Sequence, residues 1–160
     1  MKNVNTRLVK DKYKQLSELG SRYNLSFSSH LILGSKLIAL DGINKSLLIS
    51  EVNNELDQPH IIELNKVAAV SIKKGYGNIK PGQLTNKSFE EFLKRIDLKF
   101  EYGNQDQATV FLTFYDSETD EVRDIPRLER NAKNWQLILS KMLVSRTEKI
   151  MKRQTEASLA

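Results

Sequence analysis

The chain has 160 residues and a mass of 18.4 kDa, which is the size of one ordinary domain. Hydrophobic residues make up 39% and charged residues 28%, a composition typical of globular proteins rather than of disordered or membrane-spanning ones. Because there is no cysteine, disulfide frameworks, thiol nucleophiles and cysteine-bound zinc are excluded. Two histidines are also too few for a three-histidine metal centre.

The net charge of +5 is unevenly distributed along the chain. Residues 1–25 carry six basic and two acidic side chains, residues 26–125 carry eleven and fifteen, and residues 126–160 carry eight and three. Basic ends that flank an acidic middle suggest an anionic partner surface, or ends that dock on the middle of the chain. No secretory leader and no membrane-spanning run is recognisable, so we expect a cytoplasmic protein, with peripheral membrane association left open.

The first 25 residues predict an amphipathic helix that packs on the body of the protein. Apolar side chains recur at spacings of three and four from Thr6 to about Tyr23, and lysines occupy the positions between them. Gly20 interrupts the pattern, so we expect the helix to end either there or at Asn24.

Seven short segments rich in Leu, Ile and Val then predict strands. The clearest is 96–102, where apolar and charged residues alternate without exception, which indicates one buried and one solvated face. Asp41 and Gly42 begin a turn after the second segment, because Asp-Gly readily adopts the conformations of a hairpin loop. The seven segments are 27–33, 36–41, 46–52, 60–64, 67–74, 96–102 and 109–115.

The connection 75–95, between the fifth and sixth segments, is long enough to be an insertion. Its first part, 75–82, is a loop by its glycine and proline content. Ser88 followed by Glu91 fits a capping box, which predicts a short helix to about Arg95.

The chain closes with its longest predicted helix. Pro126 suits the first helical position, where no amide donor is needed. The helix carries an apolar stripe with Trp135 at its centre, and we interpret Trp135 as a core residue. After Leu143 basic residues replace the apolar ones, so the last turns should project or fray. The stripe consists of Leu128, Ala132, Trp135, Leu139 and Met142.

Seven strands followed by an amphipathic helix with a central Trp135 resemble the pleckstrin-homology-like (PH-like) superfamily. Segments 36–49 and 61–70 are similar to an early and a middle hairpin of its small bacterial members. The resemblance covers about 27–145 and implies an α+β fold, a seven-stranded antiparallel partly open β-barrel or sandwich capped by the C-terminal helix. The N-terminal helix is an addition to that pattern.

The resemblance divides the chain into an N-terminal helix (1–25), a PH-like barrel with its C-terminal helix (26–145) and a basic, frayed tail (146–160). Phosphoinositide-binding members cluster basic residues across the first hairpin. Only Lys36 and Lys45 are basic there, so the resemblance does not extend to specific inositol-phosphate recognition.

Three patterns that could carry chemistry have simpler structural explanations. His30 and His60 are the available bases for a nucleophile, and both stand at strand edges outside any nucleophile-elbow pattern. Five carboxylates lie within 116–124, but Glu121 and Arg127 occupy the positions where a calcium loop needs glycine and glutamate. The glycines of 75–77 lack the Gly-Lys-Ser/Thr of a phosphate-binding loop.

We therefore expect a non-catalytic binding or adaptor module that engages a protein partner or an anionic membrane surface. No catalytic residue, metal, cofactor or specific nucleic acid is predicted, and the oligomeric state is left open. The predicted contact residues are Lys73, Lys74, Tyr76 and Lys80 in the loop region and Arg146, Lys149, Lys152 and Arg153 in the tail.

A small-ligand carrier is the competing hypothesis, with an apolar ligand held between Trp135 and the sheet. An enzyme is the weakest of the three hypotheses, because no catalytic constellation is recognisable.

Overall fold

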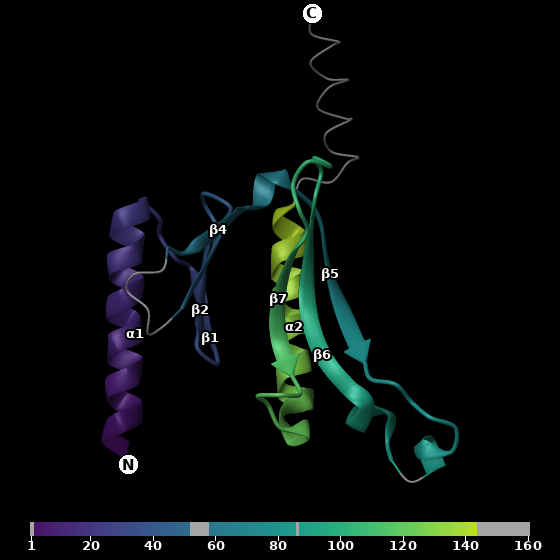
Figure 1. Ribbon diagram of the computed structural model, residues 1–160. Helices are drawn as coiled ribbons and strands as arrows, with labels where there is room; N and C mark the ends of the chain where they lie inside the picture. The colour runs from purple at the N-terminus through teal and green to yellow at the C-terminus, as the bar shows by residue number, and fades with distance from the viewer. Residues whose placement is uncertain (1, 52–57, 86, 144–160) are drawn as a thin grey trace, which may run out of the picture. The chain divides into compact units, whose positions relative to one another are not determined.

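The computed structural model describes residues 2–51, 58–85 and 87–143, with side chains from Lys12 onward (Figure 1). The described residues form two compact units, one up to Leu64 and one from Asn65 on. Each unit joins an antiparallel sheet to one α-helix. The architecture is therefore α+β, with helices near both ends of the chain.

The first unit contains a helix and a four-stranded antiparallel sheet in sequential order β1-β2-β3-β4. Its strands agree with the four segments predicted from hydrophobic runs, apart from their exact ends. The elements are α1 (Lys2–Tyr23), β1 (Ser29–Leu33), β2 (Lys36–Asp41), β3 (Ser46–Glu51) and β4 (His60–Glu63).

Helix α1 passes through Gly20 and ends at Tyr23. Asn24 has a φ of 55°, the left-handed conformation that commonly terminates helices. The Leu25 amide then donates a hydrogen bond of 2.9 Å to the Gly20 carbonyl. A Cβ atom at position 20 would lie only 2.9 Å from the Leu25 oxygen, so glycine is required where the chain folds back.

Helix α1 packs on one face of the four-stranded sheet. Leu16 lies in a hydrophobic cluster with Leu37 and Ala39 of β2, and Phe27 and Ile32 cover its margin. At the edge of this contact the Gln15 side-chain amide donates to the Glu51 carbonyl at 3.1 Å. The apolar stripe predicted for this helix therefore contributes to the core, at least for the side chains that the structure describes.

Both faces of this sheet are buried. Leu37 and Ala39 point to the α1 side, and the alternate residues Ile38 and Leu40 are also fully buried. Leu47 is paired with Leu40 and shares its face, and it too is buried. A strand buried on two sides needs apolar residues at successive positions, which explains the continuous hydrophobic run in β2.

The turn between β2 and β3 is organised by Asp41, a fully buried carboxylate. It accepts backbone hydrogen bonds from Ser26 (2.8 Å), Ile43 (3.0 Å) and Asn44 (2.9 Å), and another from the Asn44 side chain (2.7 Å). The predicted turn is therefore confirmed. Its left-handed residue is Lys45, with a φ of 52°, rather than Gly42.

The second unit contains three antiparallel strands in the order β5-β6-β7 and the C-terminal helix (Figure 1). Short 3₁₀ turns connect several of these elements. The strands and helix are β5 (Val67–Tyr76), β6 (Leu93–Tyr102), β7 (Val110–Asp116) and α2 (Ile125–Met142), and the turns are η1 (Leu64–Lys66), η2 (Gln83–Thr85), η3 (Phe89–Phe92) and η4 (Val122–Asp124).

Helix α2 covers one face of the three-stranded sheet, in contact with all three strands. Trp135 is only 7% exposed, and Leu128, Ala132 and Leu139 of the same stripe are buried with it. The sheet contributes Val70, Leu98, Phe100, Leu112 and Phe114 to this core. The predicted register of the helix is confirmed, including Pro126 in its first turn.

Strand β6 follows its predicted alternation. Ile96 and Leu98 lie on the α2 side and Asp97 on the open face, although all three are buried. Ile96 and Asp97 are paired with Tyr115 and Thr113, so the extra residue at this register shift is Phe114 of β7. Such a bulge allows neighbouring residues to point to the same side, and Phe114 and Tyr115 are both buried.

The predicted α+β class with antiparallel strands is confirmed, and the seven strands form two sheets, of four and three strands, and not a closed barrel. One prediction about strand pairing is wrong. The segment 61–70 is not a hairpin, because β4 pairs with β3 and β5 pairs with β6. The 3₁₀ turn η1 lies between β4 and β5, so the chain passes from one sheet to the other there instead of reversing within one sheet.

The predicted helix from Ser88 to Arg95 is also wrong. The Ser88 side chain makes no capping hydrogen bond, and the helical segment is the single 3₁₀ turn η3. Strand β6 begins directly after it, and Leu93 and Ile96 are buried in the sheet. Burial of these two residues stabilises the extended conformation more than the pairs Glu90–Lys94 and Glu91–Arg95 would stabilise a helix.

Candidate functional site

The connection between β5 and β6 protrudes from the three-stranded sheet, past the end of β7 and away from α2 (Figure 1). Its base is closed by a hydrogen bond of 2.8 Å from the Gly77 amide to the Phe92 carbonyl. Gly75 and Tyr76, which were predicted to lie in a loop, still belong to β5. The protruding segment therefore begins at Gly77 and ends at Phe92.

This connection concentrates exposed apolar side chains. Tyr76 is 41% exposed, Leu84 52% and Phe89 51%. The rings of Tyr76 and Phe89 pack at a centroid distance of 4.6 Å and an interplanar angle of 50°, so the two aromatics lie together at the base of the connection. We define the loop surface as Tyr76, Leu84 and Phe89 with the exposed lysines Lys73, Lys80 and Lys87.

The structure separates the predicted loop residues into two groups. Lys73, Tyr76 and Lys80 are exposed in or beside the connection. The Lys80 backbone amide is held by the Gln83 side chain at 2.7 Å, which fixes the start of the turn η2. Lys74 instead forms a hydrogen-bonded ion pair with Glu129 of α2.

The separation of Lys73 from Lys74 follows from strand geometry, since successive side chains point to opposite faces. Lys73 is in register with Asp97 on the open face of the sheet, and Lys74 is in register with the buried Ile96. The Lys74 ammonium consequently lies on the α2 side, where it joins β5 to the helix. This residue supports the fold of the second unit and does not belong to the loop surface.

The pair of Lys74 and Glu129 shifts both groups toward their charged forms. The hydrogen bond from Lys74 lowers the pKa of Glu129 below its ordinary value of 4.5, although burial opposes this change. The same bond to Glu129 raises the pKa of Lys74 above its ordinary value of 10.5. Lys133 approaches the same carboxylate at 3.5 Å, so Glu129 is compensated from two sides.

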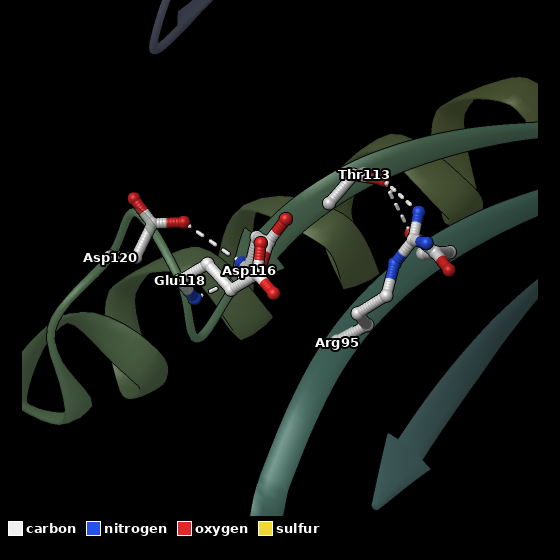
Figure 2. A network of polar contacts seen from close by, with 6 residues as sticks. Arg95, Thr113, Asp116, Glu118 and Asp120 are labelled. Carbon is white, nitrogen blue, oxygen red and sulfur yellow. Dashed lines mark hydrogen bonds and ion pairs between the residues drawn. The ribbon is translucent and has the colours of Figure 1, made fainter.

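The open face of the three-stranded sheet carries a polar network that sequence patterns did not single out. Figure 2 shows Arg95 of β6 and Thr113 of β7 pointing toward each other, with Nη2 and Oγ1 2.7 Å apart. The Thr113 hydroxyl donates to Asp97 Oδ1 at 2.7 Å, and Arg95 approaches that oxygen at 3.3 Å. Asp97 is buried, and its Oδ1 atom is held by the Arg95 guanidinium and the Thr113 hydroxyl.

The acidic turn after β7 satisfies its own backbone (Figure 2). Asp120 accepts a hydrogen bond from the Asp116 amide at 2.9 Å, and Asp116 accepts one from the Glu118 amide at 3.0 Å. Burial, with Asp120 and Asp116 nearby, raises the pKa of Tyr115 above its ordinary value of 10.0. These contacts are those of a chain reversal, in line with the structural explanation of the acidic residues.

The histidines lie in structural surroundings. The His30 ring packs edge-on against Tyr13 with centroids 5.3 Å apart, and His60 is an exposed residue at the start of β4. Within the described part of the chain, no three His, Asp or Glu side chains are grouped closely enough to hold a metal ion.

The predicted tail residues Arg146, Lys149, Lys152 and Arg153 lie outside the residues that the structure describes. Among the described helices, none is long and apolar enough to cross a membrane. The chain matches no family model, no curated protein and no solved structure. The physical character of the exposed surfaces is therefore the basis on which a function is proposed.

Proposed function

We propose that this protein is a non-catalytic binding module that engages a protein partner through the loop surface. The observation that carries this proposal is the exposure of Leu84 and Phe89 on one protruding connection and of Tyr76 at its base. Large apolar side chains are unfavourable in water, and aromatic residues such as Tyr76 and Phe89 are enriched in the cores of protein interfaces. The surrounding lysines would supply a polar rim.

Charge favours a protein partner over an anionic membrane. The protruding segment from Gly77 to Phe92 carries Lys80 and Lys87, but also the exposed carboxylates Glu90 and Glu91 beside Phe89. Insertion of Phe89 into a lipid surface would bring these two carboxylates toward acidic headgroups. A segment without net charge gains little electrostatic binding energy from an anionic surface, whereas a protein partner can present matching groups of both signs.

The finer fold assignment is part of the same proposal: the chain is a member of the PH-like superfamily with an added N-terminal helix. Its support is the order of elements, four strands and then three strands in antiparallel sheets, followed by a helix whose Trp135 is buried. We further propose that the module acts in the cytoplasm. An experimental structure with the two sheets packed near-orthogonally would support the superfamily assignment, and any other packing would refute it.

The binding proposal is tested by affinity capture from the source cells with a matched pair of variants. Tyr76→Ser combined with Phe89→Ser removes the aromatic pair of the loop surface. Phe111→Ser is the control, because Phe111 is an aromatic residue of similar exposure, 46%, on the open face of the same sheet. We expect proteins captured by the wild type to be lost with the double variant and retained with the control.

Two results would overturn the proposal. The first is a captured set that the double variant leaves unchanged while thermal unfolding shows that both variants are folded. The second is sedimentation of the wild type, but not of the double variant, with vesicles containing phosphatidylserine and not with neutral vesicles, together with no loop-dependent protein capture. The second result would assign the loop surface to an anionic membrane instead.

A further inference from the structure

The outward face of α2 combines exposed cations with an exposed aliphatic residue. Opposite the buried stripe, the helix presents Arg130, Leu137 and Lys141, since positions seven and eleven residues apart lie on the same side of a helix. Leu137 is 59% exposed, and the neighbouring Ile138 is 38% exposed. Arg127 and Lys133 flank this line on its two sides, and both are exposed.

Positive charge on this face is largely uncompensated. Helix α2 contains four basic residues and one acidic residue, Glu129. The Glu129 carboxylate is already paired with Lys74 and Lys133, and Arg127 is 3.6 Å from Asp124. Arg130 and Lys141 pair with no residue in the described part of the chain. An outside anion would therefore meet two cations that have no competing partner among the described residues.

We propose that this face of α2 is a docking surface for an acidic amphipathic peptide segment of another protein. The partner would place an apolar side chain on Leu137 and carboxylates on Arg130 and Lys141. The Cα atoms of these two cations are separated by about 16 Å along the helix axis, since each residue adds ~1.5 Å. A helical partner would thus carry its carboxylates about eleven residues apart, with an apolar residue between them.

Other anionic surfaces match these residues less well. A membrane-bound helix needs a broad apolar face beside its cations, and here only Leu137 and Ile138 are available. Nucleic-acid phosphates would pair with the cations but would leave Leu137 without an apolar counterpart. A peptide that alternates carboxylates with an apolar residue matches both kinds of side chain. This surface is independent of the loop surface, because it consists of other residues on another element.

The test uses phage-displayed random peptides of about 16 residues, long enough to span both cations in a helix. The full-length wild-type chain is the bait, and the best peptides are then measured by fluorescence anisotropy. We expect enrichment of peptides with acidic residues on both sides of an apolar one, and binding that weakens as salt is raised. Arg130→Glu with Lys141→Glu should weaken binding about tenfold or more, because two ion pairs become repulsions.

Matched variants separate the apolar and the electrostatic contributions. Leu137→Gln keeps the charge and helix propensity and should weaken the same peptide severalfold. Lys80→Glu with Lys87→Glu makes the same charge change on the loop surface and should leave the affinity unchanged. Tyr76→Ser with Phe89→Ser should also leave it unchanged, so failure of the loop proposal would not be mistaken for failure of this one.

The proposal is overturned if the enriched peptides are not acidic, or if they bind the Arg130→Glu, Lys141→Glu variant as well as the wild type. It is also overturned if no peptide is enriched while duplex DNA or vesicles containing phosphatidylserine bind the wild type and lose affinity for that variant. In that case the cations serve a phosphate-bearing surface. Circular dichroism of each variant verifies that α2 is intact.

Discussion

Strands β2 and β6 show how the two sheets of this chain differ. In β2, Leu37 and Ala39 point toward α1 while Ile38 and Leu40 on the other face are buried as well. The sheet that contains β6 buries one face under α2 and exposes Lys73, Arg95 and Phe111 on the other. A sheet that is buried on two sides has few residues left for recognition. Binding residues are therefore expected in the second unit, where half of the sheet, one connection and one helix face meet solvent.

The largest expected effect is on the one-sided core of the second unit. Trp135→Ala should lower the free energy of unfolding by about 3–5 kcal/mol, because a buried aromatic is removed and a cavity remains. Chemical denaturation followed by circular dichroism measures the loss. Leu137→Ala on the opposite side of α2 is the control and should be close to wild type. Near-wild-type stability of Trp135→Ala would contradict the helix register.

Paired substitutions compare the two sheets directly. Ile38→Ala, on the face of β2 turned away from α1, should cost about 2–5 kcal/mol. Lys73→Ala on the open face of β5 should change stability by no more than ~0.5 kcal/mol. Both are measured by urea denaturation. Equal losses of unfolding free energy in the two variants would contradict the distinction between a sheet buried on two faces and a sheet with one open face.

Asp41 provides a pH-dependent probe of the first unit. Burial raises the pKa of its carboxyl, but hydrogen bonds from Asn44, Ser26 and Ile43 outweigh burial and hold the pKa below its ordinary value of 3.8. A lowered pKa stabilises the fold above pH ~3.8, and this contribution is lost as the pH falls through the folded-state value. Asp41→Asn should cost about 1–3 kcal/mol at neutral pH, because buried donors lose a charged acceptor.

Unfolding of wild type and Asp41→Asn at a series of pH values checks this prediction. The difference between the two curves should shrink in acid, where the wild-type carboxyl is protonated as well. Asp106→Asn is the control, since Asp106 is exposed in the loop between β6 and β7. A difference that stays constant down to the most acidic pH would show that the charge of Asp41 does not contribute.

A smaller effect is expected from the polar network on the open face. Thr113→Val removes a hydroxyl that donates to Asp97 and accepts from Arg95, and should cost about 1 kcal/mol. Thr113→Ser keeps the hydroxyl and should lose less. Guanidinium denaturation of the two variants measures the contribution. A Thr113→Val variant as stable as wild type would mean that solvent replaces these bonds without cost.

The smallest expected effect is at the contact between β5 and α2. A double-mutant cycle with Lys74→Met and Glu129→Gln should give a coupling of at most ~1 kcal/mol, because both side chains are partly exposed. The pKa of Glu129 is lowered, so the coupling should fade as the pH falls below ~4.5 through the folded-state value. The pKa of Lys74 is raised, so the coupling should also fade well above pH ~10.5, where the ammonium loses its proton. Coupling without this pH dependence would contradict an ion pair.

Periodic patterns were sufficient to predict most of the elements. The apolar stripe through Trp135 predicted the buried face of α2, and hydrophobic runs such as 36–41 predicted strands close to their observed bounds. In these places a local pattern and the packing of the chain require the same conformation, so the sequence is informative about structure.

The failures share a physical cause, which is competition between local and non-local interactions. The capping-box pattern at Ser88 favours a helix locally, but burial of Leu93 and Ile96 in the sheet is stronger. The short connection between β4 and β5 suggested that these two strands pair with each other. They do not, because the chain passes through η1 from one sheet to the other. The network of Arg95 and Thr113 depends on the register of β6 against β7, which no pattern in either strand specifies.

The division of the candidate lysines could have been predicted from alternation alone. Lys73 and Lys74 are adjacent in sequence and were grouped as one basic site, yet adjacent residues of a strand lie on opposite faces. The alternation of β6, which is paired with β5, identifies the open face as that of Asp97. Alternation thus separates the two lysines, and the observed register shows that Lys73 is the one on the open face. The exposure of Leu84 and Phe89, in contrast, depends on the whole path of the connection.

The hydrogen bond between Gly77 and Phe92 closes the last rung of the β5–β6 ladder, so the sheet does not require any particular sequence from 78 to 91. Such a segment can change in length and composition while the scaffold below it is retained. Related chains could therefore diverge in partner through this stretch alone, and foreign epitopes could be grafted there without redesigning the domain.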